Sequence, residues 1–208
     1  RIKVDQVHPQ DDLIGLFKMP VGFDVYYTDK TKSSKVQWIE KKTEIVSVPN
    51  PENKKVAFVI FDPNRKIIKK LKFARTLEEL SNQALVAQNM IDRYDALLEM
   101  KNMPVMEKKN TLLQMYSAET FHLAKGEIIA QLSTAWDSDV EALIRRAIRD
   151  PDDKVRLAVL QNVKWVPETL REDYEELLKD KSYLNVELAL QNLSGSFPER
   201  YGRYLDIT

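Results

Sequence analysis

The chain has 208 residues, of which 43% are hydrophobic and 31% are charged, and it contains no cysteine. Its 32 basic and 32 acidic side chains cancel, so the sequence predicts neither nucleic-acid binding nor attachment to an acidic membrane surface. The lack of cysteine excludes disulfides, thiolate metal sites and cysteine nucleophiles. No apolar run approaches the ~18 residues of a membrane span, and residues 1–7 do not resemble a signal peptide. We therefore expect a soluble chain without membrane insertion, whose compartment is unknown.

The composition changes near residue 73. Residues 1–72 hold 15 basic and 9 acidic side chains, whereas residues 73–208 hold 17 and 23. The first segment is rich in short β-type runs and the second in helical periodicity. We therefore expect two domains, a β-sandwich domain over residues 1–72 and an α-helical domain over residues 73–208.

Short runs of β-branched and aromatic residues, separated by turn residues, indicate antiparallel strands in the first segment. Five such runs are residues 2–5, 21–27, 36–38, 45–48 and 56–61. Apolar residues alternate along the second run, and the last run is apolar throughout, as in a strand buried on both faces. About five to seven short strands predict a small antiparallel β-sandwich.

From Thr76 the hydrophobic period becomes helical. Thr76 and Glu79 fit a capping box. Apolar residues then recur at steps of three and four from Leu77 to Leu98, which defines one buried stripe. Further helices are expected over residues 105–116, 119–132, 137–149, 152–164, 168–180 and 183–193.

The last third of the chain repeats itself at an offset of 30 residues. Residues 147–150 align with 177–180, and residues 159–163 align with 189–193. A helix pair of this size cannot bury its apolar face alone, so like units are expected to stack as a solenoid. A weaker third copy is expected upstream, between Glu119 and Ser133.

Residues 147–160 resemble the HEAT-repeat consensus, in which Asp turns the chain, Val and Ala face inward and Arg packs across the repeat. The matching residues are Asp150, Val155, Arg156 and Ala158. In the last unit, Glu187 stands where the consensus has Arg. The resemblance implies an all-α, HEAT-like helical solenoid after the β-sandwich.

Four stretches, taken in order, resemble the C-terminal, non-catalytic half of the aminopeptidase N family of gluzincin zinc metallopeptidases. Phe17–Val21 resembles the second strand of that family's sandwich, and Phe58–Leu71 resembles the strand and Asp-containing turn that close it. Asp92–Leu97 resembles the first helical hairpin of its helical domain. Phe197–Arg200, followed by residues 204–206, is similar to the end of that domain.

Catalysis in this family is attributed to a His-Glu-x-x-His helix and a downstream Glu, which bind zinc. That motif is missing, because the only histidines are His8 and His122. The resemblance therefore implies a fragment that is not itself an enzyme and holds no cofactor, while zinc belongs to a catalytic domain of the parent protein, before Arg1.

The resemblance also implies a function and partners for the fragment. Its sandwich would brace the catalytic domain of the parent chain, and its helices would limit the access of peptide substrates to the active site. An alternative is a catalytically silent scaffold that binds a protein on the concave face of the solenoid. A third possibility is an unrelated module with a ligand site between its domains.

Four arginines are the candidate functional residues, because the inner helices of solenoids often line binding surfaces. They are expected to face the catalytic chamber or a partner, and the competing interpretation is a solvated or repeat-packing role. No catalytic or metal-binding residue is assigned. The four candidates are Arg145, Arg146, Arg149 and Arg156.

Structural roles are favoured over functional ones for the remaining polar and aromatic features. His122 is expected on a helix surface rather than in acid–base chemistry. Asp150–Asp153 is expected to form turns and helix caps rather than a cation site. Arg65–Lys72 is expected to be a strand end with a solvated face rather than a contact patch. Core or interdomain packing, rather than ligand stacking, is expected of Trp38, Trp136 and Trp165.

Overall fold

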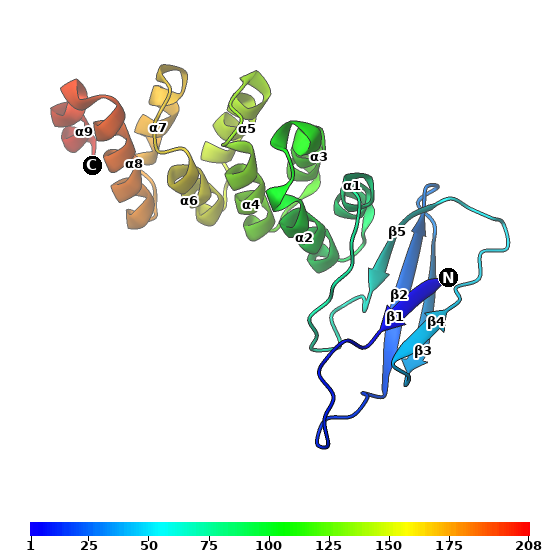
Figure 1. Ribbon diagram of the computed structural model, residues 1–208. Helices are drawn as coiled ribbons and strands as arrows, with labels where there is room; N and C mark the ends of the chain where they lie inside the picture. The colour runs from blue at the N-terminus through cyan, green and yellow to red at the C-terminus, as the bar shows by residue number, and fades with distance from the viewer. The chain divides into compact units, whose positions relative to one another are not determined.

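The computed structural model describes residues 1–208, and two small antiparallel sheets are followed by nine α-helices (Figure 1). The expected mixture of β and α structure is confirmed. The chain forms two compact units, residues 1–96 and 97–208. The first unit extends beyond residue 72, because helix α1 (Leu77–Val86) packs on strand β5 (Val56–Phe61).

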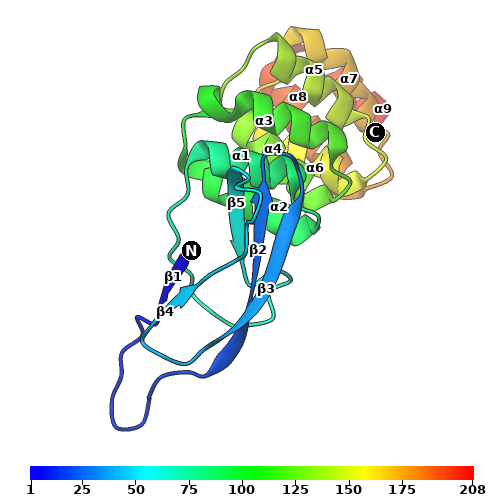
Figure 2. The ribbon, with the colours of Figure 1, turned by 90° about the vertical axis from the view of Figure 1, so that its right-hand side faces the viewer.

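The remaining strands are β1 (Ile2–Asp5), β2 (Met19–Tyr27), β3 (Lys32–Ile39) and β4 (Thr43–Val46). β1 pairs with β4, and β2 lies between β3 and β5 in the second sheet (Figure 2). All five predicted runs contain strand, although β4 ends at Val46, two residues before the end of its predicted run. β3 is longer than predicted, because its first four residues are polar and carry no hydrophobic signal.

The two sheets share one apolar core. Val21 and Phe23, from β2, and Ile39, from β3, pack with Val46 of β4, and all four are almost completely buried. The alternation along β2 sends Val21 and Phe23 to the same face, as predicted. The second sheet therefore covers the first with its alternate side chains.

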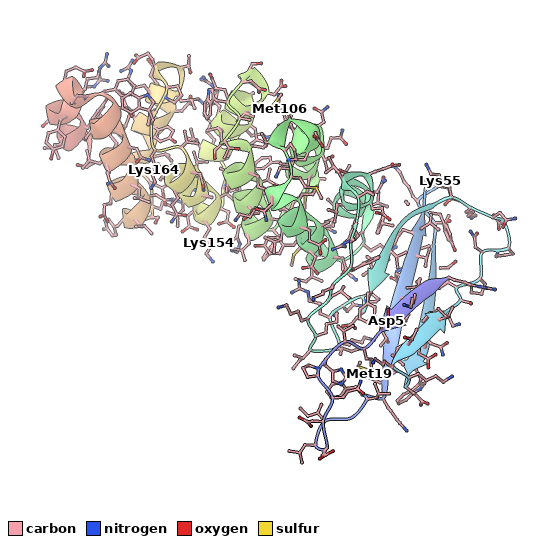
Figure 3. The ribbon with its side chains drawn as sticks, viewed as in Figure 1. Asp5, Met19, Lys55, Met106, Lys154 and Lys164 are labelled. Carbon is pink, nitrogen blue, oxygen red and sulfur yellow. The ribbon has the colours of Figure 1, made fainter.

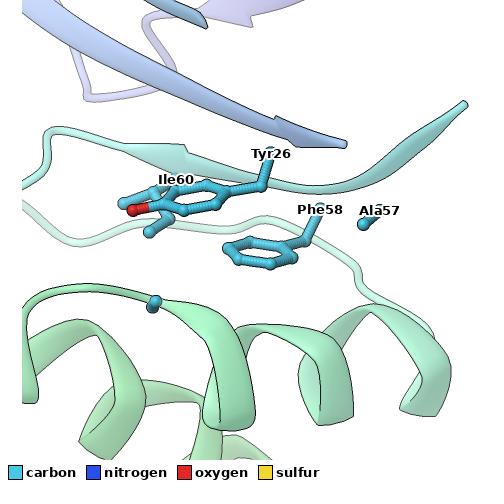
Figure 4. Packing of buried hydrophobic residues seen from close by; sticks show 5 residues of the cluster. Tyr26, Ala57, Phe58 and Ile60 are labelled. Atoms are coloured by element: carbon cyan, nitrogen blue, oxygen red, sulfur yellow. The ribbon is translucent and has the colours of Figure 1, made fainter. Parts of the chain in front are cut away.

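The opposite face of the three-stranded sheet packs against α1. Tyr26 and Phe58 are stacked with their ring centroids 4.4 Å apart, and Ile60 lies beside them (Figure 4). Ala87, just after α1, completes this cluster. Strand β5 contributes to both faces of the sheet, which confirms the prediction made from its continuous apolar run.

The turn after β5 is organised by the buried carboxylate of Asp62. It accepts hydrogen bonds from the backbone N–H groups of Lys66 and Ile67, both at 3.0 Å, and from Lys69 Nζ at 2.5 Å. The Asp62 backbone N–H donates to Gly22 O at 2.8 Å. The turn is thereby joined to the central strand of its sheet.

The apolar stripe that begins at Leu77 is divided between two helices, α1 and α2 (Met90–Glu99). The predicted capping box of Thr76 and Glu79 is confirmed. The break follows Ala87, where Arg93 Nη1 donates to the carbonyl groups of Ala87 and Gln88 at 3.1 and 3.0 Å. A side chain from the next helix thus replaces the bonds that continued helix would make.

The second unit begins in the last turn of α2 and contains the remaining helices. None of the helices in the chain combines the length and the apolar character of a membrane span. The six ranges expected to be helical all contain helix, and α9, which had no clear periodic signal, was not predicted. The helices are α3 (Val105–Ala118), α4 (His122–Leu132), α5 (Ser138–Ile148), α6 (Asp153–Asn162), α7 (Arg171–Leu177), α8 (Tyr183–Ser196) and α9 (Tyr201–Ile207).

Helices of successive pairs pack in two rows (Figure 1). Helices α4, α6 and α8 pack one against the next, while α5 packs against α7. Gly126 of α4 allows close approach to α6, because a Cβ atom built there would lie 3.3 Å from Ala158 Cβ. Lys154 lies in the first turn of α6, the middle helix of its row, and Lys164 follows the end of that helix (Figure 3).

Polar bonds tie each helix pair to the next. Asn185 and Asn192 of α8 donate to the Asp153 and Leu160 carbonyl groups of α6, at 3.1 and 2.8 Å, and both bonds span 32 residues. Lys125 of α4 reaches Asp150 at 2.8 Å. The two asparagine bonds span two residues more than the 30-residue offset read from the sequence, and the Lys125 bond spans 25 residues.

Removal of the hydroxyl group is expected to affect the stability of the chain differently at two buried tyrosines. Tyr174 donates to Val163 O at 2.8 Å, whereas the buried Tyr204 hydroxyl has no hydrogen-bond partner. We expect Tyr174→Phe to lower the free energy of unfolding by about 1 to 2 kcal/mol, and Tyr204→Phe to change it by less than about 0.5 kcal/mol. Chemical denaturation of both variants is the measurement, and equal losses would contradict the assignment.

Candidate functional site

Helix α5 positions three of the four candidate arginines. Asp137 caps the helix by accepting hydrogen bonds from the backbone N–H groups of Asp139 and Val140. The apolar stripe of α5 is buried, so its arginines are left on the other side of the helix. The buried stripe consists of Val140, Leu143, Ile144, Ala147 and Ile148.

Arg145 and Arg149 share one carboxylate of the neighbouring helix pair. Their guanidinium nitrogens lie 3.0 and 2.6 Å from the oxygens of Asp173 on α7, whose side chain is only 4% exposed. Arg145 also donates to Thr169 O at 2.7 Å and pairs with Glu141. The Arg149 side chain is 71% exposed, so it is more accessible than the side chains of Arg145 and Arg156.

Arg146 lies over an aromatic ring of α3. Its guanidinium carbon is 4.9 Å from the centroid of the Tyr116 ring, and Lys125 Nζ is 5.6 Å from the same centroid. Arg146 also donates to Ser117 Oγ at 3.3 Å. The Tyr116 hydroxyl is buried without a hydrogen-bond partner. Burial, together with the nearby Asp150 carboxylate, raises the pKa of Tyr116 to about 12.

The raised pKa of Tyr116 predicts a loss of stability at alkaline pH. The folded chain holds this proton more tightly than the unfolded chain, whose tyrosines titrate near pH 10, so the stabilisation is complete below about pH 10. It is lost as the pH rises towards 12. We expect wild type to lose about 2 to 3 kcal/mol over this range relative to Tyr116→Phe. Urea denaturation at a series of pH values measures the difference, and parallel pH profiles would contradict it.

Arg156 joins two helix pairs from a mostly buried position. Its Nε and Nη2 atoms donate to the two Asp180 oxygens at 2.5 and 2.9 Å. Its Nη1 atom donates to the carbonyl groups of Asp150 and Pro151. The side chain of Arg156 is 13% exposed and that of Asp180 is 2% exposed. Arg156 of α6 is thereby bonded to the turn between α7 and α8.

The four candidates therefore contact neighbouring helices to different degrees. Arg156 is held inside the stack, and Arg145 and Arg146 rest on partners from α7 and α3. Arg149 keeps most of its side chain in solvent while contacting Asp173. It is better placed than Arg145 or Arg156 to meet another molecule.

The two histidines occupy different units and make local contacts. His8 Nε2 lies 2.9 Å from Gly15 O, and the His8 ring is tilted against Phe17 with centroids 4.7 Å apart. His122 opens α4, and its Nδ1 atom is 3.6 Å from the Asp152 carboxylate. No three His, Asp or Glu side chains in the chain are grouped so that they could hold a metal ion.

The aspartates between α5 and α6 act as turn and capping groups, as predicted. Asp152 accepts a hydrogen bond from Lys154 N at 2.9 Å at the start of α6. Asp150 accepts from Asp152 N at 3.0 Å and from Lys125 Nζ. These carboxylates are occupied by neighbouring donors.

The basic stretch after β5 differs from the prediction, because residues 65–72 form a loop and not the end of a strand. Asp62 turns the chain away from the sheet immediately after β5. Arg65 pairs with Asp95, and Lys69 pairs with Asp62. Two of its five positive charges are thereby engaged within the first unit.

The tryptophans were expected to pack in the core or between domains, and the core part of this prediction is wrong. Trp38 is 55% exposed, Trp136 is 39% exposed and Trp165 is 73% exposed. Trp38 lies on the outer face of an edge strand, and the other two occupy the loops between helix pairs. These positions follow from the topology, which the spacing of the tryptophans along the chain does not reveal.

Two pockets lie in the first unit, and no residue of either was predicted to bind a ligand. A pocket of about 280 Å³ opens on the three-stranded sheet, between Gly22, Val36 and Pro63. A pocket of about 520 Å³ lies beside β1, with Lys3, His8 and Lys42 among its lining residues.

No known protein family, curated protein or solved structure matches this chain.

Proposed function

We propose that this chain is the non-catalytic region of a zinc aminopeptidase-like protein. A β-sandwich in the first unit braces the catalytic domain, and a HEAT-like solenoid in the second limits the access of peptides to it. The observation that carries the proposal is the order of the parts. Two sheets around one core are followed by helix pairs joined through Arg156 and Asp180.

Two sets of contacts support the finer description of the fold. The shared core of Phe23 and Val46 is what a sandwich requires of two sheets. Val155 and Ala158 are buried, while Arg156 spans to the next unit, as in a HEAT repeat. A stack of this kind offers a long surface, which suits a wall that selects peptides by size.

The alternative function is a catalytically silent scaffold that binds a protein partner. Exposed aromatic side chains favour it, because Trp136 and Trp165 occupy the loops that follow α4 and α6. Tryptophan is enriched at the centres of protein interfaces. The two functions differ in what the parent protein contains, and not in the architecture of these residues.

The first experiment is a peptidase assay. We expect the purified chain, supplied with zinc, to release no N-terminal residue from aminoacyl reporter substrates above the rate of a zinc-free sample. Activity that is abolished by chelation and restored by zinc would contradict the proposal. The second experiment is to sequence the gene upstream of the Arg1 codon. A His-Glu-x-x-His motif with a later Glu supports the aminopeptidase, whereas an upstream domain without these ligands supports the scaffold.

A further inference from the structure

Residues 7–17, in the loop between β1 and β2, form a protruding segment that we name the finger. It extends beyond the sheets of the first unit (Figures 1 and 2). Leu13 is 94% exposed, and a cluster of exposed apolar side chains of this size is typical of an interaction site. The exposed large apolar residues of the finger are Val7, Leu13, Ile14, Leu16 and Phe17.

Hydrogen bonds hold the finger in one conformation. At its base, the Gln6 side chain donates to Phe17 O at 2.8 Å and accepts from Phe17 N at 3.0 Å. Halfway along, His8 Nε2 lies 2.9 Å from Gly15 O. At its tip, Asp11 Oδ1 accepts from the backbone N–H groups of Leu13 and Ile14. A pre-organised loop loses little conformational entropy when it binds.

The exposed apolar surface continues from the finger onto the sheet. Lys18 and Met19 alone separate Phe17 from Pro20, and Met19 marks where the finger joins β2 (Figure 3). Pro20 pairs with Trp38, as Gly22 does with Val36, so these residues share one face of the sheet. Trp38 and Val36 are 55% and 69% exposed, and Val36 lines the pocket of about 280 Å³.

The charges of the finger and the pocket are complementary. The tip carries Asp11 and Asp12, and the pocket is lined by Lys35 and Lys66. Two carboxylates also line the pocket, but each is already bonded. Asp24 accepts from Lys32 Nζ and Ser34 Oγ, and Asp62 accepts from Lys69 Nζ and two backbone N–H groups.

We propose that the chain forms a two-fold symmetric dimer in which the finger of each copy enters the pocket of the other. Leu13 and Ile14 would contact the apolar side chains that line the pocket, such as Val36 and Pro63. Asp12 would lie opposite Lys66. A two-fold interface requires one surface to carry both complementary parts, and the finger adjoins the pocket through β2. The acidic tip disfavours an anionic lipid surface as the occupant. The inference goes beyond the proposed function and does not depend on it.

Sedimentation equilibrium of the purified chain tests the dimer. We expect a mass that rises with concentration from monomer to dimer. Leu13→Asp should raise the dimer Kd by about tenfold or more, because it places a charge in an apolar contact. Ile68→Asp is the matched control, since Ile68 is also fully exposed but lies outside the finger and the pocket. It should leave the Kd unchanged. Circular dichroism verifies that both variants are folded.

Charge reversal tests the arrangement independently of apolar contact. Asp12→Lys and Lys66→Asp should each weaken the dimer, and the double variant should recover most of the loss. The proposal is overturned by a monomer at every concentration, by a dimer that tolerates Leu13→Asp, by equal weakening in the Ile68 control, or by failure of the double variant to recover affinity. Binding of a monomeric chain to lipid vesicles through the finger would also overturn it, in favour of a membrane.

Discussion

Arg156→Met is expected to lower the free energy of unfolding by about 3 to 5 kcal/mol. Asp180 is almost completely buried and accepts two hydrogen bonds from Arg156. Burial alone would raise the pKa of Asp180, but Arg156 and the backbone N–H of Ser182 hold it below its ordinary value. The variant would leave this carboxylate charged, buried and without its cation. Urea denaturation at neutral pH is the measurement.

Arg149→Met provides the matched control. Arg149 also pairs with an Asp that lies 24 residues later, but its side chain is 71% exposed and Asp173 keeps Arg145 as a second partner. We expect a loss of less than about 1 kcal/mol. Similar losses in the two variants would show that Arg156 is not the residue that locks neighbouring helix pairs.

Asp62→Ala is expected to cost about 3 to 4 kcal/mol, because it removes the acceptor for two backbone N–H groups and the partner of Lys69. Asp62 also has a positive φ of 55°, a conformation that alanine adopts with more strain than aspartate does. Hydrogen exchange of the backbone amides of β5, followed in the whole chain, measures this loss of stability.

Asp62→Asn separates these two contributions. Asparagine tolerates a positive φ and keeps one side-chain oxygen, but it lacks the negative charge that faces Lys69. We expect a loss of about 1 to 2 kcal/mol, between wild type and the alanine variant. If Asn and Ala were equally destabilising, the charge of Asp62 and not the backbone conformation would dominate the turn.

Much of the fold follows from local patterns in the sequence. The alternation of Val21, Phe23 and Val25 and the apolar run in β5 located both principal strands, because each pattern reports burial directly. The division between α1 and α2 was not visible in the periodicity. The division depends on hydrogen bonds from the Arg93 side chain to carbonyl groups just after α1. The spacing of apolar residues cannot predict such hydrogen bonds.

The candidate site shows the same contrast. Packing of Arg156 across the repeat was expected from its resemblance to the HEAT consensus, but its pairing with Asp180 was not predicted. The pairing of Arg145 and Arg149 with Asp173 was not predicted, since nothing in the residues around Asp173 marks it as buried. The exposure of Trp165 depends on where the loops between helix pairs lie, which is a property of the assembled stack.

The ties between helix pairs have a mechanical consequence. Arg156 to Asp180 and Asn192 to Leu160 each join one pair to the next, so a tension applied along the stack passes through these interfaces in series. Units that hold only their neighbours unfold as separate steps. When a single chain is stretched through its C-terminus, its length should therefore increase in discrete steps. Arg156→Met should lower the force at which α6 separates from α8.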